Sequence, residues 1–157
     1  MKTIGCDDSV ILNQWHPISS LDVLHIGNLD KTVLLDTMIC FQLNGVGDVS
    51  VWLQSDILKT LLPTRISYGF VWVCLGKPPD VLFPFPEFDE VDRRNVATGV
   101  FGVNVSAGRT VENFLDMGHF PYVHSGILGE EPHTEVKEYD VEVSKERDEV
   151  LATSCKF

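Results

Sequence analysis

The sequence predicts a mostly β protein of the α+β class, built from antiparallel strands. Three observations lead to this fold class: short apolar runs separated by Gly, Asn and Asp over residues 21–53, four prolines within residues 77–87, and one stretch with helical periodicity near residue 110. The chain has 157 residues, 44% of them apolar, which is enough for one globular domain, or for one small domain and part of another.

The first half of the chain is predicted to be β. Within residues 21–53 the runs TVLLD, MICFQL and DVSVWL are rich in strand-forming residues, and NGVGD suits a hairpin loop, so a small antiparallel unit is expected. Residues 55–62 are expected to form a short helical turn that ends before Pro63. The apolar run ISYGFVWVCLG, residues 66–76, predicts one buried strand.

The proline-rich stretch that follows predicts a linker. Proline fixes φ and lacks an N–H, so residues 77–95 cannot be a regular helix or an inner strand, and we expect them to run over the surface. The side chains expected to pin this linker are Phe83, Phe85 and Phe88. The valine-rich stretch ATGVFGVNVSAGR, residues 97–109, predicts another strand.

The best helix candidate is RTVENFLDMG, residues 109–118. Val111, Phe114 and Leu115 have the i, i+3, i+4 spacing of one helix face, and Gly118 supplies a stop. Residues 134–157 then predict a hairpin with a charged turn at 145–148. Its second strand reaches the last residue without a cap or polar tail, so we expect a C-terminally truncated chain, with a natural end as the alternative.

Charge and composition exclude several functions. The chain carries 12 Lys and Arg against 23 Asp and Glu, a net charge of −11, which disfavours nucleic acid and anionic membranes as partners. It has neither the order of a secretory signal at its start nor roughly 18 uninterrupted apolar residues, so a cytoplasmic protein is expected. The four dispersed cysteines are expected to be free and mostly buried.

The stretch NFLDMGHFPYVH, residues 113–124, is a candidate metal site. Two histidines and a carboxylate form the facial site of non-haem Fe(II) oxygenases. On one continuous helix His119 and His124 would lie about 140° apart, but Gly118 and Pro121 are expected to end the helix and allow the two side chains to meet. Spacing alone makes Asp116 a possible third ligand; the alternatives are an exposed acid and two hydrogen-bonded imidazoles.

This stretch resembles the N-x-x-D-x-x-H-x4-H motif in catalytic (alpha) subunits of Rieske non-haem iron oxygenases. WHPISSLDVL and YGFVWVCLGKPPDVLFPFPEF resemble the opening and the end of that family's Rieske domain. The resemblance implies a degenerate Rieske-like antiparallel β domain at residues 1–76, the linker at 77–95, and at 96–157 the incomplete N-terminal part of a helix-grip (Bet v1-like) catalytic domain.

The resemblance also assigns roles within the motif. It implies that His119 and His124 bind a mononuclear Fe(II), while the third ligand is a carboxylate beyond the last residue here. Asp116 becomes a catalytic bridge that passes electrons from a cluster-binding histidine of a neighbouring subunit, rather than a ligand. Asn113 lies beside the ligands and supports them.

One departure from the family pattern is informative. A Rieske [2Fe–2S] cluster needs two Cys and two His in C-x-H and C-x-x-H pairs, and this sequence has neither pair, so no cluster is expected in this chain. Electrons must then come from a Rieske-cluster-bearing reductase or a sister oxygenase subunit, within a homo- or hetero-trimer-based oligomer. Such a cluster-less pattern is most similar to methylxanthine N7-demethylases, which implies N-demethylation of a small heterocycle by O2-dependent hydroxylation.

Two alternatives to this oxygenase component are kept. A truncated, non-catalytic remnant would serve as a subunit or binding module. The other alternative is a small β domain in which a chance histidine pair binds zinc.

Overall fold

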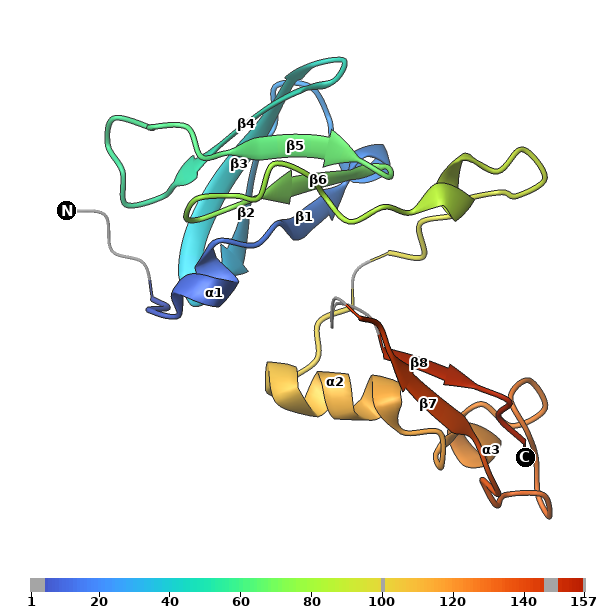
Figure 1. Ribbon diagram of the computed structural model, residues 1–157. Helices are drawn as coiled ribbons and strands as arrows, with labels where there is room; N and C mark the ends of the chain where they lie inside the picture. The colour runs from blue at the N-terminus through green and yellow to red at the C-terminus, as the bar shows by residue number, and fades with distance from the viewer. Residues whose placement is uncertain (1–4, 100, 146–149, 157) are drawn as a thin grey trace. The chain divides into compact units, whose positions relative to one another are not determined.

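A computed structural model describes residues 5–99, 101–145 and 150–156. The chain divides into two compact units, Met1–Phe101 and Gly102–Phe157. The first unit is built mainly from short antiparallel strands, and the second contains two helices and one two-stranded hairpin (Figure 1). Taken together, the described residues are mostly β with few helices, which confirms the mostly β, α+β fold class. The described residues contain no helix both long and apolar enough to cross a membrane.

A three-stranded antiparallel sheet forms the centre of the first unit. Its order is β2 (Leu29–Leu34), β3 (Thr37–Gly45) and β4 (Asp48–Leu53). The predicted β unit and its hairpin loop are therefore confirmed. Gly47 has φ +72°, a conformation that glycine adopts without a Cβ clash, and this allows the two-residue turn between β3 and β4.

A second three-stranded sheet has the order β1 (His16–Ser20), β6 (Phe70–Val73) and β5 (Thr64–Ser67). The prediction of one strand across residues 66–76 was wrong, because the chain reverses at Tyr68 and Gly69. Both residues have positive φ, +53° and +74°, which matches a hairpin turn of the type that follows the right-handed strand twist.

The first unit has only short helical turns among its described residues. They are α1 (Ser9–Leu12), η1 (Leu21–Val23) and η2 (Pro86–Asp89). The helical turn expected at residues 55–62 is instead a loop. The carboxylate of Asp56 accepts hydrogen bonds from the backbone N–H groups of Leu58 and Thr60, at 3.1 and 3.0 Å, which favours a turn over a helix.

The core of the first unit lies between its two sheets. Ile39, Val51 and Leu53 of one sheet and Val71 and Val73 of the other are fully buried and belong to one apolar cluster. Burial of each such side chain contributes about 1.5–3 kcal/mol. This cluster is the main source of stability for the first unit.

The predicted linker is pinned to the first unit by aromatic contacts. Tyr68, in the β5–β6 turn, lies 5.4–5.6 Å from the ring centres of Phe83, Phe85 and Phe88. The three phenylalanines therefore act as the sequence predicted.

The second unit contains two helices and one hairpin: α2 (Ala107–Leu115), α3 (Phe120–Val123), β7 (Asp140–Val143) and β8 (Val150–Thr153). The predicted helix and hairpin are confirmed, although β8 ends at Thr153 and most of the predicted 145–148 turn lies outside the described residues. The strand predicted at residues 97–109 was wrong: its described residues contain no strand, and α2 begins within it.

Burial in the second unit is slight. Among its described residues Pro121 alone is buried. The apolar face that predicted helix α2 is present but exposed, with Val111 at 57%, Phe114 at 78% and Leu115 at 72%. Within its described part, the second unit therefore has apolar faces without an apolar core.

Candidate metal-binding site

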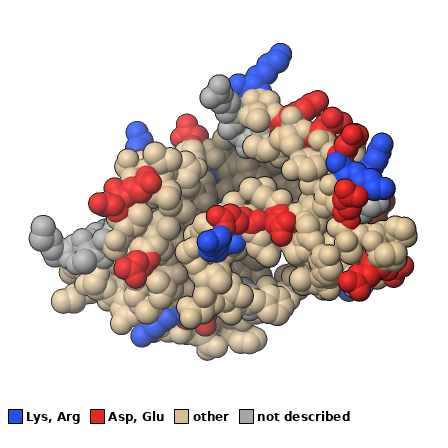
Figure 2. Space-filling view, turned by 90° about the horizontal axis from the view of Figure 1, so that it is seen from below, with Lys and Arg blue, Asp and Glu red and all other residues tan. Residues whose placement is uncertain are grey.

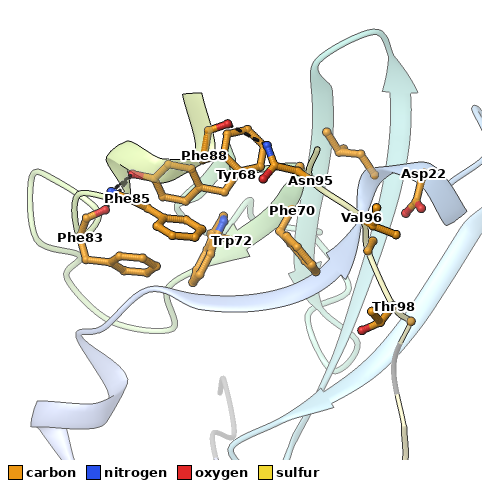
Figure 3. Close-up of a pocket in the computed structure, with 14 residues that line it drawn as sticks. Asp22, Tyr68, Phe70, Trp72, Phe83, Phe85, Phe88, Asn95, Val96 and Thr98 are labelled. Atoms are coloured by element: carbon orange, nitrogen blue, oxygen red, sulfur yellow. Dashed lines mark hydrogen bonds between the residues drawn. The ribbon is translucent and has the colours of Figure 1, made fainter. Parts of the chain in front are cut away.

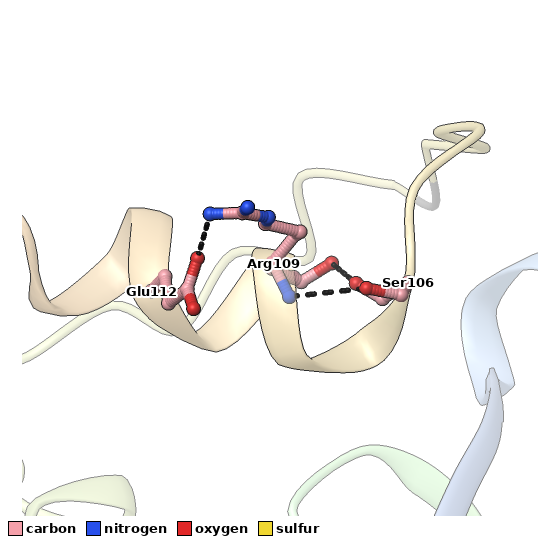
Figure 4. A network of polar contacts seen from close by, with 4 residues as sticks. Ser106, Arg109 and Glu112 are labelled. Atoms are coloured by element: carbon pink, nitrogen blue, oxygen red, sulfur yellow. Dashed lines mark hydrogen bonds and ion pairs between the residues drawn. The ribbon is translucent and has the colours of Figure 1, made fainter.

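Helix α2 leads into the motif and begins with a side-chain cap. The Ser106 hydroxyl accepts a hydrogen bond from the backbone N–H of Arg109 at 3.4 Å, and Arg109 pairs with Glu112 at 2.6 Å (Figure 4). Such a cap satisfies an N–H that the first turn leaves unpaired and is worth about 1 kcal/mol. The ion pair is largely exposed, so it contributes no more than about 0.5 kcal/mol.

Asp116 marks the end of helix α2. Its N–H still donates to the Glu112 carbonyl at 2.9 Å, but its ψ of 114° is extended, so the helix ends at Leu115. The Asp116 Oδ1 atom accepts a hydrogen bond from the N–H of Gly118 at 2.8 Å. A local turn, and not a shared helix face, therefore brings Asp116 and His119 together.

The second carboxylate oxygen of Asp116 contacts His119. Oδ2 lies 3.2 Å from the His119 Nδ1 atom, and the His119 side chain is 15% exposed while that of Asp116 is 57% exposed. The N–H of Gly118, and next the His119 side chain, hold the pKa of Asp116 below its ordinary value. Asp116 is therefore an ionised acceptor at neutral pH.

The contact with Asp116 fixes the tautomer of His119. An ionised carboxylate only accepts hydrogen bonds, so the Nδ1 atom of His119 must carry the proton it donates. The Nε2 atom of neutral His119 then keeps its lone pair. A carboxylate that orients a histidine through its other nitrogen is the usual support of a metal-binding imidazole.

The short helix α3 brings the two histidines together. His119 is its N-cap and His124 its C-cap, and the two ring centres are 5.4 Å apart. Pro121 was expected to break a helix, but it lies in the first turn of α3, where the missing N–H costs no hydrogen bond. One helical turn therefore brings together the two side chains that sequence spacing alone would have separated.

Phe120 is a site residue that the sequence reasoning missed. Its ring meets His119 edge-on at 4.9 Å and lies 5.9 Å from the His124 ring. The sequence signal that could have identified Phe120 is its position directly after His119. Phe120 therefore makes an apolar contact with both imidazole rings.

Asn113 lies on α2, one turn before Asp116, and is exposed. Its side chain makes no hydrogen bond to a described residue. The supporting role that the family resemblance implies for Asn113 remains a prediction.

The donor set fits part of a metal centre. Two neutral imidazoles are suitable ligands for iron or zinc. In the described part of the chain no group of three His, Cys, Asp or Glu side chains comes close enough to hold a metal ion. These residues therefore offer two nitrogen atoms that could bind a metal and a carboxylate that orients one of the two rings.

Residues 103–155 match the family described as Vanillate O-demethylase oxygenase C-terminal domain. The resemblance to oxygenase catalytic components is thereby confirmed, and it coincides with the second unit.

A particular relative extends this similarity to almost the whole chain. It is the protein named "Probable methylxanthine N7-demethylase NdmC" from Pseudomonas sp. (strain TJI-51), 41% identical over 151 residues. The match covers 96% of this chain and 52% of the relative. The chain therefore spans about half the length of the curated relative that it matches.

Proposed function

We propose that this chain is part of the catalytic component of a non-haem Fe(II) oxygenase that removes an N-methyl group from a small, methylxanthine-like heterocycle. In the reaction O2, two electrons and two protons hydroxylate the methyl carbon, water is released, and the hydroxymethyl product loses formaldehyde. The observation that carries the proposal is the Asp116–His119 contact at 3.2 Å beside His124. The similarity to the Pseudomonas relative supports the substrate class.

Three side chains have definable tasks in this proposal. His119 and His124 would hold the iron, which when bound supplies the activation of O2. Asp116 keeps the proton on Nδ1 of His119, so that the Nε2 lone pair remains free to bind iron. The same contact prevents free rotation of the ring. Phe120 limits the access of water to one side of both rings.

The source of electrons is proposed to be another protein. The sequence has no C-x-H or C-x-x-H pair, and the Asp116 side chain is 57% exposed, so a partner that carries a Rieske cluster can reach it. The proposal includes a trimer-based oligomer and a Rieske-like origin of residues 1–76. It also includes the linker at 77–95 and an incomplete helix-grip domain at 96–157.

A second candidate is a non-catalytic remnant that acts as a subunit or binding module. The observation that favours it is the slight burial in the second unit, where Pro121 alone is buried among the described residues. A unit whose described residues form no apolar core is suited to covering another protein.

Iron binding separates the two candidates. Iron should be measured by elemental analysis, after anaerobic loading with Fe(II), in the 157-residue chain and in a chimera that adds the part of the Pseudomonas relative not matched here. We expect about one iron per chimera and weak retention in the short chain, since two ligands hold iron poorly. Stoichiometric iron in neither protein would rule out the oxygenase component.

Three histidine variants of the chimera make this test specific. His119→Ala and His124→Ala should each abolish iron retention. The matched control is His133→Ala, because His133 is exposed in a loop outside the pair. Equal iron in all three variants would contradict the assignment of the ligands.

A further inference from the structure

A pocket in the first unit has no part in the proposed iron chemistry. It has a volume of about 620 Å³ and lies between β6, the pinned linker and residues 95–99 (Figure 3). Sites for small molecules typically have volumes of about 300–1,000 Å³. The pocket is therefore large enough for a ligand of two or three fused rings.

One side of the pocket is a wall of aromatic rings. Tyr68 meets Phe85 and Phe88 at interplanar angles of 78° and 61°, and Trp72 meets Phe83 at 75°. In an edge-to-face pair, one ring keeps both of its faces uncovered by its partner. The wall therefore offers ring faces, which attract flat apolar molecules and cations.

Hydrogen bonds hold this wall in place. The Tyr68 hydroxyl donates to the Phe83 carbonyl at 2.8 Å and accepts from the N–H of Phe85 at 3.1 Å. The Trp72 indole N–H donates to the Ser67 carbonyl at 2.9 Å. Because both polar groups have partners, the wall presents apolar surface in a fixed arrangement.

The other polar side chains in the lining are those of Asp22, Asn95 and Thr98. Asp22, Val96 and Thr98 lie away from Tyr68, Phe83 and Phe85 in Figure 3. The amide nitrogen of Asn95 donates to the Phe88 carbonyl at 2.7 Å, which leaves its carbonyl oxygen available. Asp22 forms no hydrogen bond or ion pair with another described residue.

Charge decides which ligand fits. Asp22 is the one acidic residue in the lining, which contains no Lys or Arg. The net charge of −11 adds a field that favours cations over anions, and acidic side chains are prominent on the face shown in Figure 2. An anion in this pocket would be repelled by Asp22, and no Lys or Arg of the lining would compensate its charge.

We propose that this pocket binds a planar aromatic cation, with its rings against the aromatic wall and its positive charge toward Asp22. The attraction combines ring contact, cation–π interaction and the Asp22 carboxylate. The proposal rests on the first unit alone, so it stands or falls separately from the iron site.

Three probes of similar shape and different charge test the proposal. Isothermal titration calorimetry of the full chain at pH 8 should compare 1-methylquinolinium, neutral quinoline and 1-naphthoate. We expect the cation to bind at least tenfold more tightly than quinoline, and naphthoate not to bind. Equal binding of cation and neutral probe, or no binding of any probe at millimolar concentration, would overturn the proposal.

Three variants locate the interaction. Asp22→Asn should weaken binding of the cation five- to tenfold and leave quinoline unchanged, whereas Asp48→Asn, which changes an acid at the β3–β4 hairpin outside the lining, should change neither. The Phe85 side chain is 43% exposed, and Phe85→Leu keeps an apolar side chain in its place. This variant should weaken binding of both the cation and quinoline. Circular dichroism and melting temperature should match the wild type for each variant. A folded Asp22→Asn protein with unchanged affinity for the cation would show that the pocket does not select by charge.

Discussion

The two units of this protein treat their apolar residues in opposite ways. The first unit packs two sheets face to face, and Ile39, Val51 and Val71 are completely buried between them. The second unit has an apolar stripe on α2 and valines along β7, yet Phe114 is 78% exposed and Val141 is 56% exposed. The same kind of periodic pattern thus gives a core in one unit and exposed faces in the other.

Local contacts, and not a buried core, hold the histidine pair in place. Within the second unit the motif is arranged by local contacts, namely the Ser106 cap, the Asp116 turn and the short helix α3. Such contacts contribute about 1 kcal/mol each and do not depend on a core. A site of this kind can form before its surroundings are complete, but it gains little rigidity from packing.

The largest expected effect is loss of core packing in the first unit. Ile39→Ala should lower the free energy of unfolding by about 2–5 kcal/mol, because it removes fully buried methyl groups. Urea denaturation followed by tryptophan fluorescence measures this change. The matched variant Val141→Ala, in the exposed hairpin of the second unit, should change stability by no more than about 0.5 kcal/mol. Similar losses from both variants would remove the contrast between the units.

A smaller effect is expected at the orienting carboxylate. In the chimera described above, Asp116→Asn should retain iron but reduce turnover about 10–100-fold, because the amide cannot act as an anionic acceptor for His119 Nδ1. Iron content and formaldehyde release measure the two properties separately. If iron is lost from this variant, Asp116 is a ligand, as its spacing first suggested.

The cap of helix α2 should have a smaller effect again. Ser106→Ala removes the acceptor for the Arg109 N–H and should destabilise the helix by about 1 kcal/mol. Hydrogen exchange of amides in residues 107–115 should become faster, while β3 and β4 stay unchanged. Ser106→Thr retains the hydroxyl and should restore most of the protection. Equally fast exchange in the first unit would mean that the units do not open independently.

The smallest effect concerns pH. Burial raises the pKa of the Cys74 thiol, despite an opposing hydrogen bond from the Gly76 backbone. A raised native pKa means that stability is complete below the pKa of an unfolded thiol, near 8.5, and is lost as pH rises through the folded value. The difference in unfolding free energy between the wild type and Cys74→Ala should therefore shrink above about pH 8.5. A difference between the wild type and Cys74→Ala that does not change with pH would refute the burial argument.

Secondary structure was predicted well where the spacing of apolar residues, or a glycine in a turn, determines the backbone. The β2–β4 sheet follows from its apolar runs and from Gly47, and α2 follows from the spacing of Val111, Phe114 and Leu115. The β5–β6 turn was missed because Tyr68 adopts a positive φ that tyrosine seldom takes, so the run looked continuous. The valines at 103 and 105 looked like a strand but have no partner strand among the described residues.

The sequence predicted that the His119 and His124 side chains meet, and their ring centres lie 5.4 Å apart, but the backbone path that joins them was not predicted. The sequence indicated that Gly118 and Pro121 would end the helix, whereas α2 already ends before Asp116 and Pro121 lies in the first turn of the next helix. Proline is compatible with both arrangements, since it stops a helix or starts one.

In the proposed iron site, the contact between Asp116 and His119 affects the order in which His119 and His124 would bind the ion. The His119 ring loses its rotational freedom when the turn folds, since its Nδ1–H is held and its side chain is only 15% exposed. His124 is exposed and has ring contacts but no side-chain hydrogen bond to a described residue. Ordering a free side chain on binding costs about 0.5–1.5 kcal/mol. His119 should therefore capture an incoming ion first, and closure of His124 onto it should be the slower, entropy-limited step.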